Sequence, residues 1–277
     1  MAVRAKLCGI RSQQDLDIAV NAGADAVGFI SGTTHYSEDA LAPEQAAKLA
    51  ALTPPFVNRV LVTHLEDADG ILALADRIGV DTIQLHGLID TTTVRRVRAG
   101  AGGRTIIRAV HVVGDEAVDM ALETAAHCDA VLLDSRTPDR LGGTGLVHDW
   151  SISERIVDTL AAVHCPVILA GGLNVRNVAT AIAQVGPFGV DVNSGVETAS
   201  GDKDPTLCAA FVAAAHQADQ SFHTSMATAM STSTPAERVA AVISEPPSSA
   251  PSTDATTASL SPTRPAVTSF SSRRAGQ

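Results

Sequence analysis

The feature that most constrains the fold of this chain is a regular alternation of short apolar runs with longer amphipathic segments. Eight apolar runs of about six residues occur before residue 195, and the segments between them carry apolar residues at helical spacing and often end in glycine. Short strands that alternate with helices of this length are typical of βα units. The predicted strands comprise residues 3–8, 25–30, 58–63, 81–86, 105–110, 129–134, 166–171 and 189–194.

Four of these units look alike where the chain enters the strand, which favours a closed, cyclic arrangement. The stretches "AGADAVGF", "IGVDTIQL", "AAHCDAVLL" and "FGVDVNS" each place an Asp before or within a short apolar run. Eight units fit a (β/α)8 TIM barrel, for which about 200 residues is the lower limit. A doubly wound open sheet is the alternative, but "LCGIRS" after the first strand lacks the GxGxxG fingerprint that such sheets often carry.

Composition agrees with a parallel sheet that is covered by helices. Hydrophobic residues make up 45 % of the chain, but aromatic residues make up only 3 %. Most of the buried surface must therefore come from Ala, Val, Ile and Leu. These small and branched side chains suit an α/β fold in which helices pack on the sheet.

The amino-acid composition changes abruptly near residue 220. The following stretch, residues 221–277, is dominated by Ser, Thr, Ala and Pro and shows no sustained periodicity. Such a segment cannot bury enough apolar surface to offset the entropy of ordering. We therefore expect a barrel catalytic domain over residues 1–220 and a disordered tail over 221–277.

Charge and cysteine usage exclude several classes of protein. The formal net charge of −10 argues against a nucleic-acid surface, which needs clustered Lys and Arg. The four cysteines are far apart and show neither CxxC pairs nor His/Cys clusters at metal-ligand spacing. No signal peptide or membrane-spanning segment is evident. These observations predict a cytoplasmic protein with reduced thiols, no metal and no membrane partner.

Barrel enzymes gather their reactive groups at the carboxyl ends of the strands, so the residues at these ends are informative. Four side chains that can carry chemistry end the predicted strands: Cys8, His86, Asp134 and Asp191. A thiol with a pKa near 8.5 and a carboxyl with a pKa near 3.9 can act as base and acid if their surroundings adjust them. An isolated Cys at a strand end is also commonly a packing residue, and this alternative stays open.

Glycines at the ends of the last two predicted strands indicate a phosphate site. The motifs "AGGLN" and "VNSGVE" place Gly171, Gly172, Ser194 and Gly195 in the loops where barrels of this type often bind phosphate. Tight turns are the alternative explanation for these glycines. The loop after the sixth strand, "SRTPDRLGGTG", is either a lid over a ligand or a flexible surface turn, and its residues Gly143, Arg136 and Arg140 are candidate ligand contacts.

Taken in order, the motifs "KLCGI", "QLHG", "LLDS" with "GGTG" and "DWS", "PVILAGGLN", "VDVNSGVE" and "KDP" strongly resemble the phosphoribosylanthranilate isomerase family of tryptophan biosynthesis. The resemblance extends from about residue 4 to about residue 216. It implies a TIM barrel and a cofactor-free Amadori rearrangement of N-(5'-phosphoribosyl)anthranilate to 1-(2-carboxyphenylamino)-1-deoxyribulose 5-phosphate. It also implies a small phosphorylated substrate as the partner. The sequence leaves a monomer and a homodimer both open.

The resemblance assigns roles to individual residues. Asp134 matches the general acid of the family and Cys8 matches its general base. The glycines after the last two strands, with Ser194, match the phosphate-binding loops. His86 and Asp191 match positions close to the substrate, although a lone His is also often structural.

One departure from the family pattern concerns the carboxylate of the substrate. Where the family carries an arginine after the second strand, this chain reads "GTTHYSEDALAPEQA", and no arginine occurs between Arg11 and Arg59. Either Arg108, Arg136 or Arg140 takes over carboxylate binding, or the enzyme acts on a different phosphoribosyl amine. A phosphate-binding barrel without catalysis is the third hypothesis.

Overall fold

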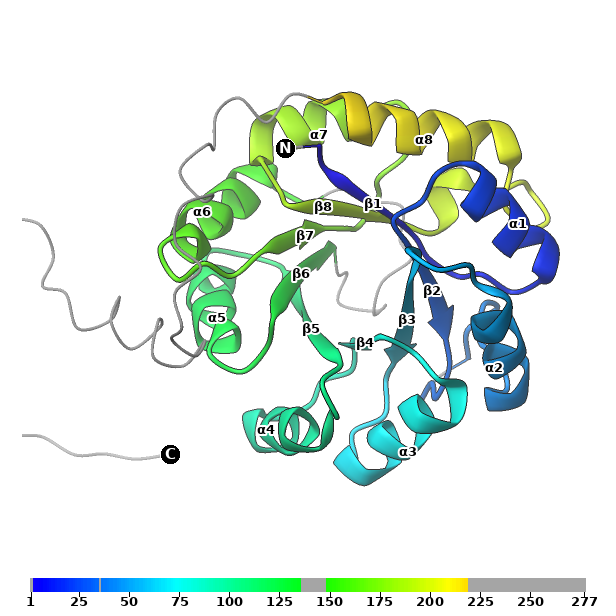
Figure 1. Cartoon of the computed structure of the whole chain (residues 1–277). Coiled ribbons are helices and arrows are strands. Elements are labelled where there is room, and N and C mark those ends of the chain that lie inside the picture. The colour runs from blue at the N-terminus through cyan, green and yellow to red at the C-terminus, as the bar shows by residue number, and fades with distance from the viewer. Residues whose placement is uncertain (1, 35, 136–147, 219–277) are drawn as a thin grey trace, which may run out of the picture. The chain divides into compact units, whose positions relative to one another are not determined.

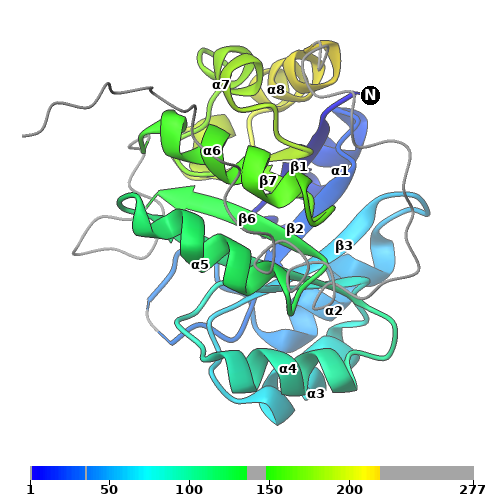
Figure 2. The same cartoon turned by 90° about the vertical axis from the view of Figure 1, so that its left-hand side faces the viewer.

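The computed structural model describes residues 2–34, 36–135 and 148–218. Within these residues eight parallel strands follow the chain order and close into a barrel, in which β1 pairs with both β2 and β8. Figure 1 shows the ring of strands, and Figure 2 shows the helices packed outside it. The strands are β1 (Arg4–Leu7), β2 (Ala26–Ile30), β3 (Asn58–Thr63), β4 (Thr82–Leu85), β5 (Thr105–Val112), β6 (Ala130–Ser135), β7 (Val167–Leu169) and β8 (Gly189–Val192).

A helix follows each strand, and capping side chains at the N-terminus fix where several of these helices begin. Ser12 and Asp15 form a capping box at the start of the first helix, and Asp67, Asp90 and Asp204 cap later ones by accepting backbone N–H bonds. The helices are α1 (Gln13–Asn21), α2 (Pro43–Leu52), α3 (Ala68–Ile78), α4 (Thr91–Gly100), α5 (Glu116–Ala125), α6 (Trp150–Ala161), α7 (Val178–Val185) and α8 (Pro205–Gln217), with a short 3₁₀ helix, η1 (Ser194–Val196), after β8.

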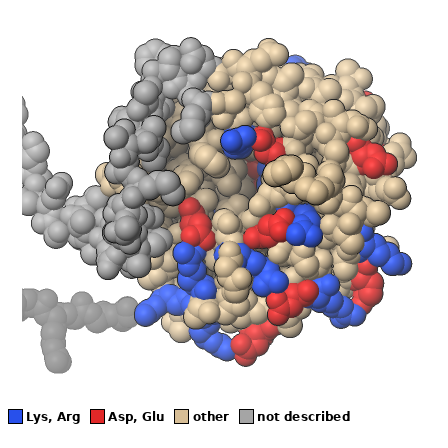
Figure 3. Space-filling view, viewed as in Figure 1, with Lys and Arg blue, Asp and Glu red and all other residues tan. Residues whose placement is uncertain are grey.

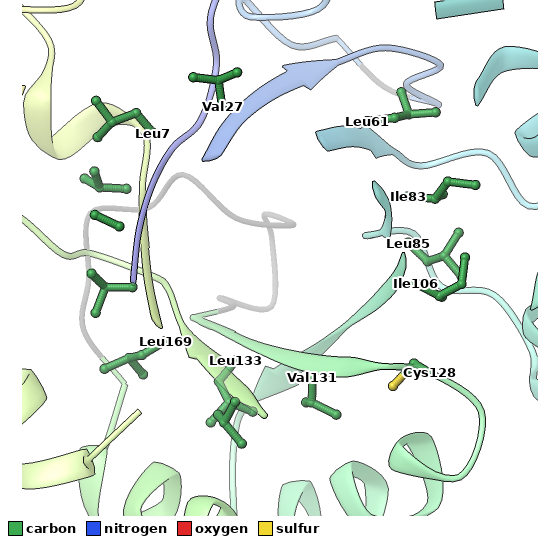
Figure 4. Packing of buried hydrophobic residues seen from close by; sticks show 14 of the residues in the cluster. Leu7, Val27, Leu61, Ile83, Leu85, Ile106, Cys128, Val131, Leu133 and Leu169 are labelled. Atoms are coloured by element: carbon green, nitrogen blue, oxygen red, sulfur yellow. The ribbon is translucent and has the colours of Figure 1, made fainter. Parts of the chain in front are cut away.

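Side chains alternate between the two faces of every strand, and this alternation divides the core in two. The larger cluster lies between strands and helices, where Leu7, Val27, Leu61 and Leu133 are buried. Figure 4 shows these residues as a ring around the outside of the strands. Two smaller clusters fill the barrel interior. One consists of Ile107, Ala109, Ala130, Leu132, Ile168 and Ala170. The other consists of Cys8, Ile30, Val60 and Val62.

The surface carries charges of both signs. In Figure 3 basic and acidic side chains are interspersed over the described part of the face turned to the viewer, without a continuous basic patch. Ion pairs such as Arg59–Asp81 and Arg96–Asp69 join opposite charges within the described residues.

The TIM barrel predicted from the sequence is confirmed, and every predicted strand is present within one or two residues at its ends. β5 continues two residues past the predicted end at Val110 to Val112, and this extension adds a residue to the site. In the described residues no helix is both long enough and apolar enough to span a membrane. The predicted domain boundary at residue 220 and the predicted tail, 221–277, lie outside the described residues.

Candidate active site

Cys8 lies at the mouth of the barrel, one residue beyond β1, with its side chain in the barrel interior. Its N–H donates to the carbonyl of Val192 at 2.8 Å, so the backbone still follows β8 at this point. The residue is 6 % exposed, and a Cβ added to Gly28 of β2 would lie 2.8 Å from its Sγ. The glycine inside the second strand therefore makes room for the thiol.

A buried ion pair lies directly beneath Cys8. Lys6, two residues earlier on the same face of β1, donates from Nζ to Oδ2 of Asp191 at 2.7 Å. The two side chains are 6 % and 8 % exposed. Within the described residues Oδ1 of Asp191 is buried without a hydrogen-bond partner, which leaves one acceptor of this carboxylate for a ligand.

The pair sets the electrostatics around the thiol. Burial raises the pKa of Cys8, and the positive charge of Lys6 opposes this shift while Asp191 adds to it. Burial alone would lower the pKa of Lys6, but the charges and hydrogen bonds of Asp191 and Cys8 together raise it. Cys8 is therefore a neutral thiol at rest, beside a lysine that remains charged and can stabilise a thiolate.

Asp134 ends the interior face of β6 and is held from two sides. Its Oδ2 lies 3.2 Å from Nε2 of His86, and its Oδ1 accepts from the N–H of Ser135 at 2.9 Å. Burial alone would raise the pKa of Asp134, but the bond from His86 and the charges of His86 and His111 lower it. The carboxyl is therefore ionised in the ligand-free protein, with a histidine in place to exchange a proton with it.

Three histidines line the interior beside Asp134. The ring centroids of His64 and His86 are 5.2 Å apart, and those of His86 and His111 are 5.4 Å apart, both in edge-to-face arrangement. His86, His111 and Asp134 offer ligand atoms that all lie within 4.8 Å of one another. Imidazole and carboxylate groups so placed can ligate a divalent transition metal, so the site is able to take such an ion as well as to move protons.

A polar network fixes the end of β6 on its outer side. Oγ of Ser135 lies 2.9 Å from Nδ1 of His148, and Nε2 of the same ring lies 2.6 Å from Oγ of Ser153 in α6. Burial lowers the pKa of His148, so the ring is neutral and can join the two hydroxyls as donor and acceptor. This connection orients the backbone N–H of Ser135, which donates to Oδ1 of Asp134.

The two glycine loops follow β7 and β8, so they lie at the mouth between the end of β6 and the end of β1. Gly171 and Gly172 have φ values of +82° and +67°, which glycine adopts without strain. A Cβ on Gly195 would overlap the carbonyl oxygen of Leu173, so the loops after β7 and β8 touch backbone to backbone. The N–H groups of Gly172, Ser194 and Gly195 have no acceptor within the described part of the chain. Such donors suit an anion.

The structure brings Cys8, His86, Asp134, Asp191 and the glycine loops to one mouth, as the strand-end argument predicts. It does not bring Arg108 there, and this prediction is wrong. Arg108 lies on the outer face of β5 and donates to the carbonyls of Leu85, Gly87 and Ile89. Alternation explains the error, because residues 107, 109 and 111 are the ones that face the interior. Gly143, Arg136 and Arg140 lie outside the described residues.

Sequence reasoning missed Lys6 and His111. Lys6 interrupts an apolar run and looks like an ordinary surface residue of the first strand, although its spacing of two from Cys8 places both on one face. His111 lies beyond the predicted end of β5, in register with Asp134 of β6. Extending the period-2 pattern by one step would have found it.

Comparisons with known proteins give one consistent result. Residues 5–214 match the family model described as N-(5'phosphoribosyl)anthranilate (PRA) isomerase. The N-(5'-phosphoribosyl)anthranilate isomerase of Natronomonas pharaonis is 44 % identical over 214 residues, which are 76 % of this chain and 97 % of the relative. The crystal structure of the enzyme from Thermotoga maritima superposes with a TM-score of 0.68 at 36 % identity, covering 77 % and 98 % of the two chains. A crystal structure of such an isomerase with reduced 1-(o-carboxyphenylamino)-1-deoxyribulose 5-phosphate gives 0.65 at 34 % identity, with the same coverage.

Proposed function

The chain belongs to the N-(5'-phosphoribosyl)anthranilate isomerase family, and from that premise we propose that it converts N-(5'-phosphoribosyl)anthranilate to 1-(2-carboxyphenylamino)-1-deoxyribulose 5-phosphate in tryptophan biosynthesis. The observation that carries the proposal is the meeting of a thiol from β1 and a carboxyl from β6 at the mouth that also holds the two glycine loops. An aldose–ketose rearrangement needs an acid, a base and a phosphate anchor, and the mouth offers all three.

Asp134 is the proposed general acid. It protonates the ring oxygen of the ribose, the bond from C1' to that oxygen breaks, and the nitrogen lone pair forms the C1'=N bond of a protonated Schiff base. The lowered pKa of Asp134 means that the carboxylate must first receive a proton. His86, 3.2 Å from Oδ2, is the group in place to deliver it.

Cys8 is the proposed general base. Its thiolate removes the proton from C2', and the electron pair of that bond moves to C1'=C2' and neutralises the nitrogen, which gives an enolamine. Loss of the enol proton and protonation at C1' then yield the ketone. Lys6 favours the thiolate that this step requires, and the Asp191 carboxylate, with one oxygen left for a ligand, faces the same space.

The remaining assignments are proposals that rest partly on this geometry and partly on the sequence. The phosphate is proposed to bind the backbone donors of Gly171, Gly172, Ser194 and Gly195, because a dianion is best held by fixed N–H groups. We propose residues 1–220 as the catalytic domain, acting in the cytoplasm without metal or cofactor, as a monomer or a homodimer. Gly143, which lies between β6 and α6 in the sequence, is kept as a proposed substrate contact.

Genetic complementation tests the proposal. The full chain is expressed in a bacterial strain that lacks its own isomerase of this step and is plated without tryptophan, beside an Asp134→Asn variant. Growth with the wild type and not with the variant is the expected result. A soluble, folded wild type that fails to support growth, and fails to convert the substrate in vitro, would refute the proposed activity and leave a phosphate-binding barrel or another phosphoribosyl amine.

A further inference from the structure

The substrate of the proposed reaction carries a carboxylate on its aromatic ring, and a basic side chain at the mouth must meet it. This inference therefore rests on the proposed function. Among the described residues, the loops at the carboxyl ends of the strands supply few cations. Lys6 is already bound to Asp191, Lys203 is completely buried, and Arg176 follows the glycines assigned to phosphate. Arg11, in the loop after β1, is the remaining candidate, and its side chain is 23 % exposed.

The guanidinium of Arg11 lies between two acidic side chains. Its Nε is 3.6 Å from Oδ1 of Asp39, and its Nη2 donates to Oδ1 of Asp202 at 3.2 Å. Gly201, with φ of +81°, allows the backbone to approach, since a Cβ there would lie 3.1 Å from Nη2. Nη1 has no acceptor within the described part of the chain. A planar group with spare donors can bind a further carboxylate.

Asp39 connects this arginine to the catalytic side of the mouth. Its Oδ2 accepts from Nδ2 of Asn193, the residue after β8, at 2.7 Å. The amide of Asn193 is fixed in turn, because Lys203 donates to its Oδ1 at 2.7 Å. A Cβ on Gly9 would overlap the side chain of Asn193, so the Asp39–Asn193 contact lies against the residue next to Cys8. The ion pair of Arg11 and Asp39 is therefore part of the mouth.

Asp39 belongs to the stretch after β2 in which the sequence carries acidic residues and no arginine. A carboxylate there repels the carboxylate of the substrate unless a cation compensates for it. Arg11, from the neighbouring loop, supplies that charge. We propose that Arg11 binds the substrate carboxylate, and that Asp39 holds the guanidinium in the ligand-free enzyme and yields its place when the substrate enters.

Two inhibitors that differ only in the carboxyl group test this proposal. One is the reduced product, 1-(2-carboxyphenylamino)-1-deoxyribitol 5-phosphate, and the other is its phenylamino analogue without the carboxyl. Dissociation constants are measured by calorimetry on the full chain. Arg11→Met should weaken the carboxylated inhibitor about 10- to 100-fold, the range for one lost charge-assisted hydrogen-bonded contact, and leave the analogue within about 2-fold.

Further variants separate binding from structure. Arg11→Lys should recover part of the affinity for the carboxylated inhibitor, because it keeps the charge but not the planar fork. Asp39→Asn should tighten that inhibitor about 3- to 10-fold, because it removes a competing charge and retains an oxygen for Asn193. Arg4→Met is the matched control, since Arg4 pairs with Asp25 at the opposite end of β1, and it should change neither constant.

The outcomes distinguish this inference from the proposed function. A wild type that binds both inhibitors, with Arg11→Met weakening both equally or neither, would overturn the role of Arg11 and direct attention to Arg136 and Arg140. A folded wild type that binds neither inhibitor would overturn the proposed function together with this inference.

Discussion

The buried ion pair of Lys6 and Asp191 gives the sharpest prediction about the barrel. Its two side chains come from β1 and β8, which close the barrel, and both are less than 9 % exposed. Replacing Lys6 by Met leaves a buried carboxylate without its counter-charge. We expect this variant to lose about 3–5 kcal/mol of unfolding free energy, the range for breaking one partner of a buried pair.

The double variant Lys6→Met with Asp191→Leu should be considerably more stable than either single variant. It removes both charges and both desolvation penalties and replaces them with apolar groups of similar volume. For a barrel of this size the loss in the single variant corresponds to a melting midpoint lower by about 6–20 °C. Neither the single nor the double variant should be active, because the thiol of Cys8 loses the lysine that opposes the rise of its pKa.

The measurement is thermal and urea denaturation of the wild type, the two single variants Lys6→Met and Asp191→Leu, and the double variant. Lys48→Met, on the exposed face of α2, is the control. The control should stay within about 0.5 kcal/mol of wild type. A Lys6→Met barrel as stable as the control, or a double variant less stable than both singles, would refute the reasoning.

Three further predictions concern other parts of the mouth. His86→Ala removes the bond that lowers the pKa of Asp134, so the acidic limb of the kcat/KM pH profile should move to higher pH; an unmoved limb would contradict this. The same bond contributes its full stability above the ordinary carboxyl pKa near 4. This contribution is lost as the pH falls from there through the lower pKa that Asp134 has in the folded protein, so the stabilities of wild type and variant should converge in acid denaturation. Gly195→Ala places a methyl on the carbonyl of Leu173 and should raise KM far more than Gly79→Ala, which strains the left-handed cap of α3 but adds a carbon with nothing within 4 Å; equal effects on KM would exclude the close approach of the loops.

The sequence predicts the barrel well because period and repeat are local properties that each βα unit carries by itself. The same holds for Cys8 and Asp134, since in a parallel barrel every strand end lies on one rim, whatever the distance along the chain. The prediction that Arg108 lies at the mouth fails for a local reason as well. It lies one residue out of step with Ile107 and Ala109, and alternation alone would have placed it among the helices.

What the sequence does not predict are the partners that come together only when the barrel closes. Lys6 and Asp191 are 185 residues apart, and their contact depends on the pairing of the first strand with the last. Arg11 and Asp39 meet through two loops whose conformations have no periodic signal. The first contact shifts the pKa of the thiol, and the second is the proposed carboxylate site, so both concern chemistry that motif recognition leaves out.

The most direct test of the central claim is the kcat/KM of purified full-length protein for N-(5'-phosphoribosyl)anthranilate, compared with that of Cys8→Ala and Asp134→Asn. The proteins are produced in a host without its own isomerase, and binding of the reduced product is measured in parallel. We expect each variant to lose about 10²- to 10⁴-fold in turnover, the contribution of one positioned acid or base, and to retain its affinity for the reduced product within a few-fold. Turnover at the wild-type level in either variant would contradict the assignment of that residue.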